Sequence, residues 1–387
     1  MPEARNNTLA ALVAGAALAL SALPSAAQED GLVIGHAAAV TGLLAPYDGP
    51  DGVACRVAQL NDAGGILGKP VKLLTRDTKS DPVTTANVGQ ELVDAGAGVL
   101  FGPPTDDGLI PLAGIGMGQG IPVLSVGSTQ PAFPLASPDN GYLVPYGDNA
   151  SAAAAAELAY AAGHRKAALM IAHDVGAYSL MTPEYFAKAF ERLGGQIVGR
   201  VSYHHGLADY TPQVTEISNL ADKPDMIFAA ILMPDGGVLL RTLASSDVKI
   251  PVYGTDGFDD PSLIPVSGAG SDLVTFITHG FPSEGSALKA FYDDCTKRGF
   301  NVQNVFFGLG GEAVEVIKVA AEAAGSLEPS AINAAIREIE GMKGIVSDSI
   351  TYKGQNGIPL KQMVAIQIKD GAFVEVARPI PAWVAAP

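Results

Sequence analysis

Apolar and polar residues follow one another along this chain in a pattern typical of parallel strands joined by helices. Short apolar runs recur, and the segments between them are long enough for helices. Strands of a parallel sheet are buried on both faces and have this character. The pattern therefore predicts repeated strand–helix–strand units. The predicted strands comprise residues 32–38, 71–77, 98–101, 121–124, 167–172, 196–203, 225–231 and 252–254.

Several segments between these runs carry signals for the ends of helices. The glycine pairs at 64–65 and 194–195 are typical helix ends, and Pro82 suits a first helical turn. We expect Asp148 or Asn149 to cap an alanine-rich helix. The predicted helices comprise residues 52–61, 82–95, 108–120, 151–162, 183–193, 238–246, 287–298, 310–324 and 331–340, and a hairpin over residues 361–376 turns at Asp370-Gly371.

The two halves of the chain predict the same order of elements. In each half, a strand, a loop and a helix lead to a glycine pair, and further strands and helices then alternate. This order implies two similar doubly wound α/β lobes with parallel sheets. Open sheets of this class bind ligands at the carboxyl ends of their strands. No low-complexity linker separates the halves, so we expect a hinge of several crossing segments.

Two strand-end loops, residues 102–107 and 125–130, carry the most informative candidates for a site. Gly127 allows backbone N–H groups to approach a ligand closely. Hydroxyl groups nearby can donate hydrogen bonds to the oxygen atoms of a ligand. The two loops together predict a cradle for a carboxylate or another oxygen-rich group. The hydroxyl groups of the second loop belong to Ser125, Ser128 and Thr129.

Two acids in the first of these loops have two interpretations. Asp106 and Asp107 directly precede a helix that is predicted to begin near Gly108. Acidic side chains at this position cap a helix and interact favourably with its dipole. The alternative is that they contact the ligand.

Composition and charge limit the class of protein and its partners. The 387 residues suffice for two ordinary domains, and 48% hydrophobic with 17% charged residues predicts a sizeable core. The formal net charge of −16 argues against a nucleic-acid partner, because binding phosphates needs clustered Lys and Arg. The same charge disfavours binding to anionic membrane surfaces.

The N-terminus has the features of a secretory signal peptide. Arg5 precedes an apolar run at residues 9–20, which is too short to span a bilayer. Small residues at 25–27 suit cleavage after Ala27, and no cysteine follows that could carry a lipid. No later stretch reaches transmembrane length. We therefore expect a soluble mature protein that is exported to a bacterial periplasm.

The sequence contains two cysteines, Cys55 and Cys295, and does not show whether they form a disulfide. An oxidising compartment permits a disulfide between them. The alternative is that both are buried as small hydrophobic side chains. Pairing cannot be deduced from sequence alone.

Several stretches in this order resemble the type I periplasmic binding proteins, and more narrowly the branched-chain amino-acid (Leu/Ile/Val) receptor group of ABC importers. The resemblance covers nearly the whole mature chain. It is carried by Leu32–Gly35 with Thr41-Gly42, by Gln59–Val71, by Asp81-Pro82, by Gly120–Ser125 and by Val252–Gly257.

This resemblance implies a fold with two lobes that close on a ligand like a Venus flytrap, joined by three crossing segments. A signal peptide at residues 1–27 would precede it. Lobe 1 would comprise residues 28–146 and 279–354, and lobe 2 would comprise residues 147–278 and 355–387. The implied protein partner is an ABC permease in the inner membrane. We expect a monomer.

The resemblance also implies roles for individual residues. The family's loops that bind the ligand's α-carboxylate correspond to Thr105, Gly127, Ser128 and Thr129, and its acid for the ammonium group falls on Asp256. Tyr47 and Tyr178 occupy the loops whose tyrosines close over the ligand. Buried charges need such partners. The alternative to ligand binding is that these residues have ordinary roles in turns, helix caps and loop packing. The candidate ligand-binding residues are Tyr47, Thr105, Asp106, Ser125, Gly127, Ser128, Thr129, Tyr178 and Asp256.

The chain also departs from the family pattern. Relatives commonly have a run of Ser and Thr where this chain has Pro103 to Asp107, and they have the longer Glu at Asp256. An acidic mouth suits an amine or a zwitterion better than a dicarboxylate. Amides, urea, amines and aromatic acids therefore stay open as ligands. The further acids expected near the mouth are Asp48, Asp174, Asp235 and Asp259.

No catalytic or cofactor motif competes with this interpretation. No Ser–His–Asp or Cys–His arrangement has a recognisable spacing. Residues 308–313 fit a loose dinucleotide fingerprint, but a helix start explains them better. Adjacent His204 and His205 point to opposite faces of a strand, and we expect neither a metal nor a cofactor. We expect a binding protein for an ABC importer; a ligand-sensing receptor and an exported enzyme are the alternatives.

Overall fold

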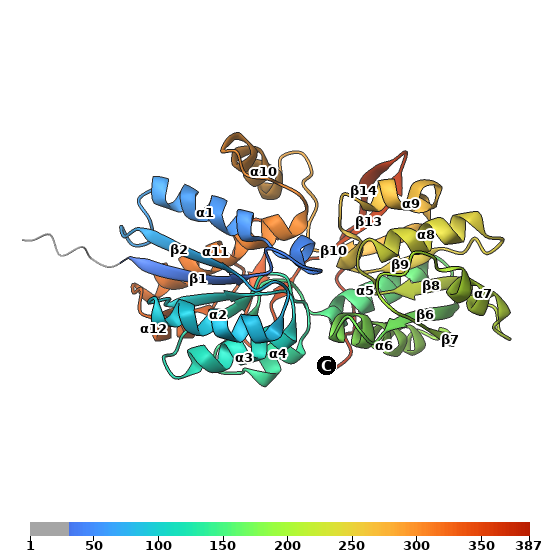
Figure 1. Cartoon of the computed structure of the whole chain (residues 1–387), viewed down its shortest axis with the longest axis horizontal. Coiled ribbons are helices and arrows are strands. Elements are labelled where there is room, and N and C mark those ends of the chain that lie inside the picture. The colour runs from blue at the N-terminus through green and yellow to red at the C-terminus, as the bar shows by residue number, and fades with distance from the viewer. Residues whose placement is uncertain (1–30) are drawn as a thin grey trace, which may run out of the picture. The chain divides into compact units, whose positions relative to one another are not determined.

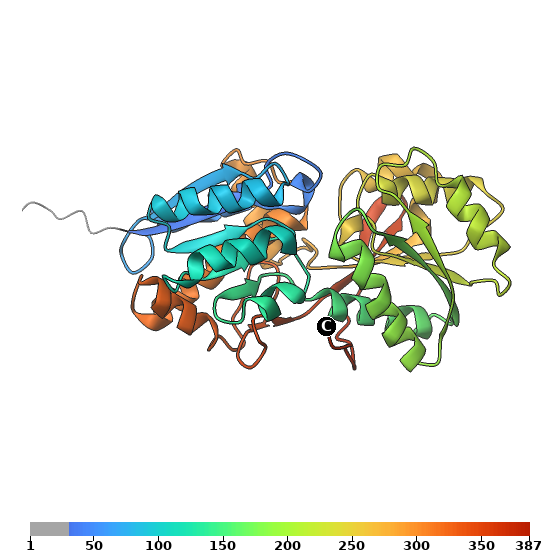
Figure 2. The same cartoon turned by 60° about the horizontal axis from the view of Figure 1, so that its bottom comes forward.

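The computed structural model describes residues 31–387 (Figure 1). The predicted signal peptide and its cleavage after Ala27 lie outside the described residues. The described chain contains two large β-sheets, and helices cover both faces of each sheet (Figure 2). The five-stranded sheet with its helices is lobe 1, and the seven-stranded sheet with its helices is lobe 2. Within residues 31–387, no helix is both long and apolar enough to cross a membrane.

Lobe 1 is built on a wholly parallel sheet with the order β2-β1-β3-β4-β5. Alternate side chains of its buried strands feed two separate cores. One core lies under α2 and α3, and the other under α1, α11 and α12. The strands are β1 (Leu32–Ala38), β2 (Val71–Asp77), β3 (Val99–Gly102), β4 (Val123–Ser125) and β5 (Gly141–Leu143), and the helices are α1 (Pro50–Asp62), α2 (Pro82–Asp94), α3 (Asp106–Met117), α4 (Ala132–Ala136), α10 (Ala287–Lys297), α11 (Val305–Ala324) and α12 (Pro329–Ile336).

Lobe 2 repeats this plan and adds a hairpin. Its sheet has the order β14-β13-β10-β9-β8-β6-β7, in which β13 and β14 are antiparallel to their neighbours. Helices α5 and α6 cover one face, and α7 and α8 cover the other. The strands are β6 (Lys166–Ala172), β7 (Gln196–Tyr203), β8 (Met226–Ala229), β9 (Val252–Gly254), β10 (Val274–Thr278), β13 (Val364–Lys369) and β14 (Ala372–Ala377), and the helices are α5 (Asp148–Ala161), α6 (Ala177–Arg192), α7 (Thr211–Asn219), α8 (Asp235–Ser245) and α9 (Leu263–Ser267).

The prediction of two doubly wound lobes is confirmed. In both sheets the first strand lies between the second and the third, so the strand order reverses beside β1 and beside β6. A reversal of this kind opens a crevice outside the carboxyl ends of the strands. Each lobe therefore offers one ligand-binding edge.

The chain crosses between the lobes three times, and the first and third crossings are bonded to each other. The crossings lie between β5 and α5, between β10 and α10, and between β11 (Ile350–Thr351) and β13 by way of β12 (Leu360–Lys361). The Tyr352 hydroxyl donates to the Leu143 carbonyl at 2.6 Å, and the Lys361 ammonium donates to the Val144 carbonyl at 2.9 Å. Lys361 also forms a buried ion pair with Glu312 of α11.

Cys55 of α1 and Cys295 of α10 form a disulfide, which answers the question that the sequence left open. The two residues are 240 positions apart in the chain. Both lie in a small apolar cluster with Phe291 and Phe307. The bond therefore ties α10, which follows the second crossing, to the first helix of lobe 1.

Some predicted elements differ from the structure. Helix α6 begins at Ala177, six positions before the predicted Pro183, which lies inside the helix. The glycines of the loose dinucleotide fingerprint also lie inside a helix, α11, where a side chain on Gly310 would meet the Gly49 carbonyl. Strands β5 and β10 were not predicted. The predicted cap of α5 was wrong, because Gly147 occupies the N-cap position and Asp148 is already helical.

Candidate functional site

A cavity of about 370 Å³ lies where the strand-end loops of both lobes meet. Its walls come from the loops after β1, β3 and β4 of lobe 1 and after β6, β8 and β9 of lobe 2. These are the carboxyl-end loops at which open α/β sheets bind ligands. Eight of the nine candidate residues line it, namely Tyr47, Thr105, Asp106, Gly127, Ser128, Thr129, Tyr178 and Asp256.

Ser125 is the ninth candidate, and it does not line the cavity. Its side chain is fully buried and donates a hydrogen bond to the Ser128 carbonyl at 2.9 Å. It therefore holds the turn that carries Ser128. A strand-end hydroxyl at the last position of β4 points into the fold, and this direction depends on the sheet's pleat.

Gly127 is needed for a close contact within the protein. A Cβ atom at this position would lie 1.9 Å from the backbone oxygen of Tyr47. The loop after β4 therefore packs directly on the loop after β1. The sequence analysis predicted that backbone N–H groups at Gly127 approach a ligand, and the structure shows that Gly127 also allows the backbone of the Tyr47 loop to approach.

The hydroxyl groups of the predicted cradle already have partners within the protein. The Thr105 side chain accepts a hydrogen bond from the Gly108 N–H at 3.2 Å and so caps α3. The Ser128 hydroxyl donates to Asp106 Oδ1 at 3.0 Å. Asp106 and Asp107 are therefore not the cap of α3; they form its first turn, as the acids of a favourable dipole interaction do.

The Asp106 carboxyl lies in a poorly hydrated part of the cavity wall. Burial, opposed by the Ser128 hydrogen bond and assisted by the neighbouring charge of Asp107, raises the pKa of this carboxyl to about 7. Desolvation disfavours a charged carboxylate, whereas a donated hydrogen bond stabilises it. Asp106 therefore titrates near neutral pH.

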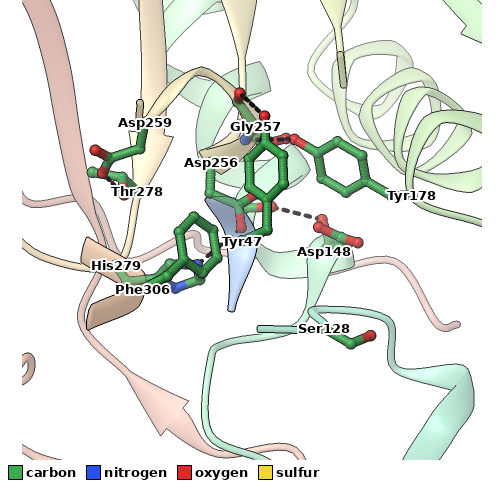
Figure 3. A network of polar contacts seen from close by, with 12 residues as sticks. Tyr47, Ser128, Asp148, Tyr178, Asp256, Gly257, Asp259, Thr278, His279 and Phe306 are labelled. Atoms are coloured by element: carbon green, nitrogen blue, oxygen red, sulfur yellow. Dashed lines mark hydrogen bonds and ion pairs between the residues drawn. The ribbon is translucent and has the colours of Figure 1, made fainter. Parts of the chain in front are cut away.

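Asp256 presents a free oxygen atom on the lobe 2 side of the cavity. Its side chain is almost completely buried, and Oδ2 lies 3.0 Å from His279 Nε2. Among residues 31–387, the other oxygen, Oδ1, has no hydrogen-bond partner. The His279 ring packs against Tyr146 and Phe306, with ring centroids 4.1 and 5.7 Å away, and Figure 3 shows it beside Phe306. Burial lowers the pKa of His279, so the imidazole is neutral.

Two tyrosine hydroxyls close the cavity from different lobes. Tyr47 of lobe 1 donates to the Gly257 carbonyl at 3.0 Å and accepts from the Met233 N–H at 2.6 Å, and both of these groups belong to lobe 2. The Tyr178 hydroxyl accepts from the Gly257 N–H at 2.8 Å (Figure 3). Burial raises the pKa of both hydroxyls above their usual value, so both stay protonated.

Asp148 is a buried acid near the cavity, and the sequence predicted it only as a possible helix cap. This fully buried residue starts α5 directly after the first crossing, and its Oδ2 accepts from the Gln130 amide. Its Oδ1 has no hydrogen-bond partner in the described part of the chain. Burial, followed by the charge of Asp256, raises the pKa of Asp148 well above its usual range. The sequence signal was an acid at the start of a predicted hinge helix, which an ordinary cap explains equally well.

Of the further acids expected near the mouth, only Asp174 lines the cavity. Asp48 and Asp235 are buried, Asp259 is half-buried, and all three form hydrogen bonds within their own lobe. Asp48 accepts from the Ala39 N–H at 2.7 Å, Asp235 accepts from the Gly206 N–H at 2.8 Å, and Asp259 accepts from the Thr278 hydroxyl. The expectation of a mouth crowded by all four acids was therefore wrong.

A family model described as "Periplasmic binding protein" matches residues 31–372. The Leu/Ile/Val-binding protein BraC3 of Rhizobium johnstonii is 26% identical over 337 residues, which cover 84% of this chain and 89% of that protein. The Leu/Ile/Val-binding protein homolog 1 of Brucella abortus is 26% identical over 360 residues, which cover 90% of this chain and 94% of that protein.

Solved structures share the fold. The leucine-binding protein LivK of Thermotoga maritima has a TM-score of 0.79 at 24% identity, and the match covers 90% of this chain and 99% of that one. A solute-binding protein of Rhodopseudomonas palustris in complex with p-hydroxybenzoic acid has a TM-score of 0.80 at 20% identity, and the match covers 91% and 98%. At these identities the likeness shows the fold alone; the first protein is named for leucine, and the second is in complex with an aromatic acid.

Proposed function

The chain belongs to the periplasmic binding protein family, and we propose that it captures a small amino-acid-like ligand between its lobes and delivers it to the membrane permease of an ABC importer. The observation that carries the proposal is the cavity at the carboxyl ends of both sheets, into whose wall Asp256 brings a buried oxygen atom without a partner. A buried acceptor of this kind is stabilised by a donor that the ligand supplies.

Capture would proceed by closure of the lobes on the ligand. A ligand that contacts both walls binds the closed arrangement better than the open one, and this difference in affinity shifts the population toward closure. We assign residues 28–146 and 279–354 to one moving body and residues 147–278 and 355–387 to the other. Residues 1–27 would direct the chain to the periplasm, where the closed form meets the permease.

Individual residues would divide the work between the lobes. Asp256 would accept from an ammonium or amide N–H group of the ligand, and Tyr47 and Tyr178 would cover it. The loop after β4 would offer Thr129 and backbone N–H groups to the ligand's polar end. The family is a class of solute-binding receptors, and we propose a binding role without turnover for this chain. A receptor that reports the ligand to a signalling protein would use the same cavity.

A thermal-shift screen of the mature chain, residues 28–387, tests the proposal. The panel contains aliphatic amino acids, amines, amides with urea, and aromatic acids. A ligand that binds only the folded state stabilises it by about 2.7 kcal/mol at a hundred times its Kd. We expect at least one compound to raise the melting temperature and Asp256→Asn to reduce that shift. Asp247→Asn, on the exposed surface of lobe 2, is the matched control.

Two results would contradict the proposal. One is the absence of any shift across the panel. The other is conversion of a bound compound into a product during incubation, detected by chromatography, because that result would indicate an enzyme. A permease partner is tested separately, by stimulation of transporter ATPase activity with the ligand-loaded chain.

A further inference from the structure

The charges around the cavity are all of one sign. Asp106 and Asp107 line it from lobe 1, and Asp174 and Asp256 line it from lobe 2. Among the described residues, no lysine, arginine or histidine lines the cavity. A ligand carboxylate that lost its water here would meet four acids and no cation. Burial of a charge without a partner of opposite sign is costly, so this cavity disfavours anionic groups.

A carboxyl group of the protein accepts from one of the hydroxyl groups that the family resemblance assigns to a ligand carboxylate. The Ser128 hydroxyl donates its hydrogen bond to Asp106 at 3.0 Å, and the Thr105 side chain caps α3. Asp106 thus takes a donor that a ligand carboxylate would need. Like charges within a few ångströms repel, most strongly where water is excluded. The lobe 1 side is therefore better suited to a positive group.

Asp256 supplies an independent observation on the opposite side. Its side chain is 3% exposed, and its Oδ1 atom has no hydrogen-bond partner within residues 31–387. His279 already satisfies Oδ2. The fully buried Asp148 lies beside Asp256 (Figure 3), and burial together with the charge of Asp256 raises the pKa of Asp148. A positively charged group that donates hydrogen bonds would give the Asp256 Oδ1 atom the partner that it lacks.

The wall between these acids is largely apolar. Leu44, Ile110 and Phe306 from lobe 1 and Val175 and Leu232 from lobe 2 line it. Methylene groups gain free energy when they are buried against such side chains. The aromatic faces of tyrosine and phenylalanine also attract organic cations. The cavity therefore combines acids on both lobes with apolar surface between them.

We propose that the cavity selects a small aliphatic diamine, with one ammonium group at Asp256 and the other at Asp106. This inference rests on the proposed capture of a small solute between the lobes, and it replaces the amino-acid-like ligand with a dication that has no carboxylate. Asp106 is the specificity-determining residue, because it replaces a site for an anion with a site for a cation. By pairing with Asp106, the second ammonium group would connect the ligand to lobe 1 and so favour the closed arrangement of the lobes.

Titration calorimetry of the mature chain at pH 8 and low salt tests the inference with four probes, 1,4-diaminobutane, butylamine, leucine and benzoate. We expect 1,4-diaminobutane to bind at least ten-fold more tightly than the other three. Asp106→Asn should weaken diaminobutane binding at least ten-fold and reduce its advantage over butylamine. Asp106→Ser, which replaces the acid with a hydroxyl donor, should lower diamine affinity and raise leucine affinity. Asp247→Asn should leave all four affinities unchanged.

The outcomes separate this inference from the function on which it rests. Tight binding of leucine or benzoate without binding of diaminobutane would overturn the diamine inference and leave the capture of a solute intact. Diaminobutane binding that neither Asp106 variant alters would overturn the role of Asp106. Failure of every compound in the wider panel to bind would count against the proposed function and the inference together.

Discussion

Asp106 lies where its ionised form is disfavoured, and this position links ligand choice to pH. Burial raises the pKa of its carboxyl to about 7, whereas an unfolded chain has a value near 3.9. Between about pH 4 and pH 7 the folded state therefore holds a proton that the unfolded state releases. Folding stability from this residue falls as pH rises through that window. The charged groups that face it, Asp107 and Asp148, are acids, so no cation offsets the effect.

Asp106→Asn should therefore stabilise the ligand-free protein at pH 8 by about 1–3 kcal/mol and have little effect at pH 4. The amide keeps an acceptor for the Ser128 hydroxyl and removes the buried charge. Melting temperatures of both proteins at the two pH values measure this difference, and titration of the other carboxyl groups cancels between them. An equal shift at both pH values would contradict the link to ionisation.

The positions of the site residues were predictable, but the partners of their side chains were not. The rule that ligands bind at strand ends and the family resemblance together selected eight residues that do line the cavity. The same rule could not show that Ser128 donates to Asp106 or that Ser125 turns inward. Those contacts depend on side-chain conformations and on loops that meet only in the folded chain. Asp148 was missed for the same reason, since its partner Gln130 comes from another loop.

At the scale of elements, a buried ion pair stabilises the segments that cross between the lobes. Glu312 of α11 accepts from the backbone N–H groups of Val346 and Ser347 at 2.8 and 3.1 Å and pairs with Lys361 of β12. Lys361 in turn donates to the Val144 carbonyl on the first crossing. The pair thus joins a helix of lobe 1 to two of the three crossings.

Lys361→Met should lower the free energy of unfolding by about 3–5 kcal/mol, because it leaves Glu312 as a buried charge without its cation. Urea denaturation followed by circular dichroism measures the loss. The double variant Lys361→Met with Glu312→Gln should recover part of it, since no isolated charge remains. A loss below about 1 kcal/mol in the single variant would show that the pair does not stabilise the hinge.

The element predictions were accurate where local patterns are strong. The bounds of β7 and β9 agree with the predicted strands, and β13 and β14 turn at Asp370 and Gly371, which both have positive φ. The three residues of β5 are too few to form a pattern. Strand β10 carries β-branched residues that favour a strand, and the prediction omitted it. The start of α6 depends on loop packing at Tyr178, which no local signal encodes.

At the scale of the whole molecule, Tyr47 joins the two lobes directly. Its hydroxyl bonds Gly257 and the Met233 N–H across the cavity. Neutral hydrogen bonds of this kind contribute about 1 kcal/mol each. They favour the closed arrangement over the open one. The repeated order of elements predicted two lobes, but no repeat indicates which side chain bridges them.

Tyr47→Phe should shift the ligand-free protein toward open forms and weaken ligand binding about ten-fold, because two bonds across the cavity are lost and the ring stays. Small-angle X-ray scattering should give a larger radius of gyration for the variant without ligand. Tyr253→Phe, whose ring lies in the lobe 2 core, is the control. Unchanged scattering and unchanged affinity would contradict a role of Tyr47 in closure.

The three crossings also determine when a newly synthesised chain can complete its cores. The sheet of lobe 1 ends at Leu143, but the helices that cover one of its faces continue to Ile336. At 5–20 residues per second, a ribosome needs roughly 10–40 s to supply the missing part. During that time the nascent chain exposes an apolar face of the sheet, and Cys55 cannot yet form its disulfide with Cys295. Lobe 1 can therefore complete this core only after the part of the chain that forms most of lobe 2 has been synthesised.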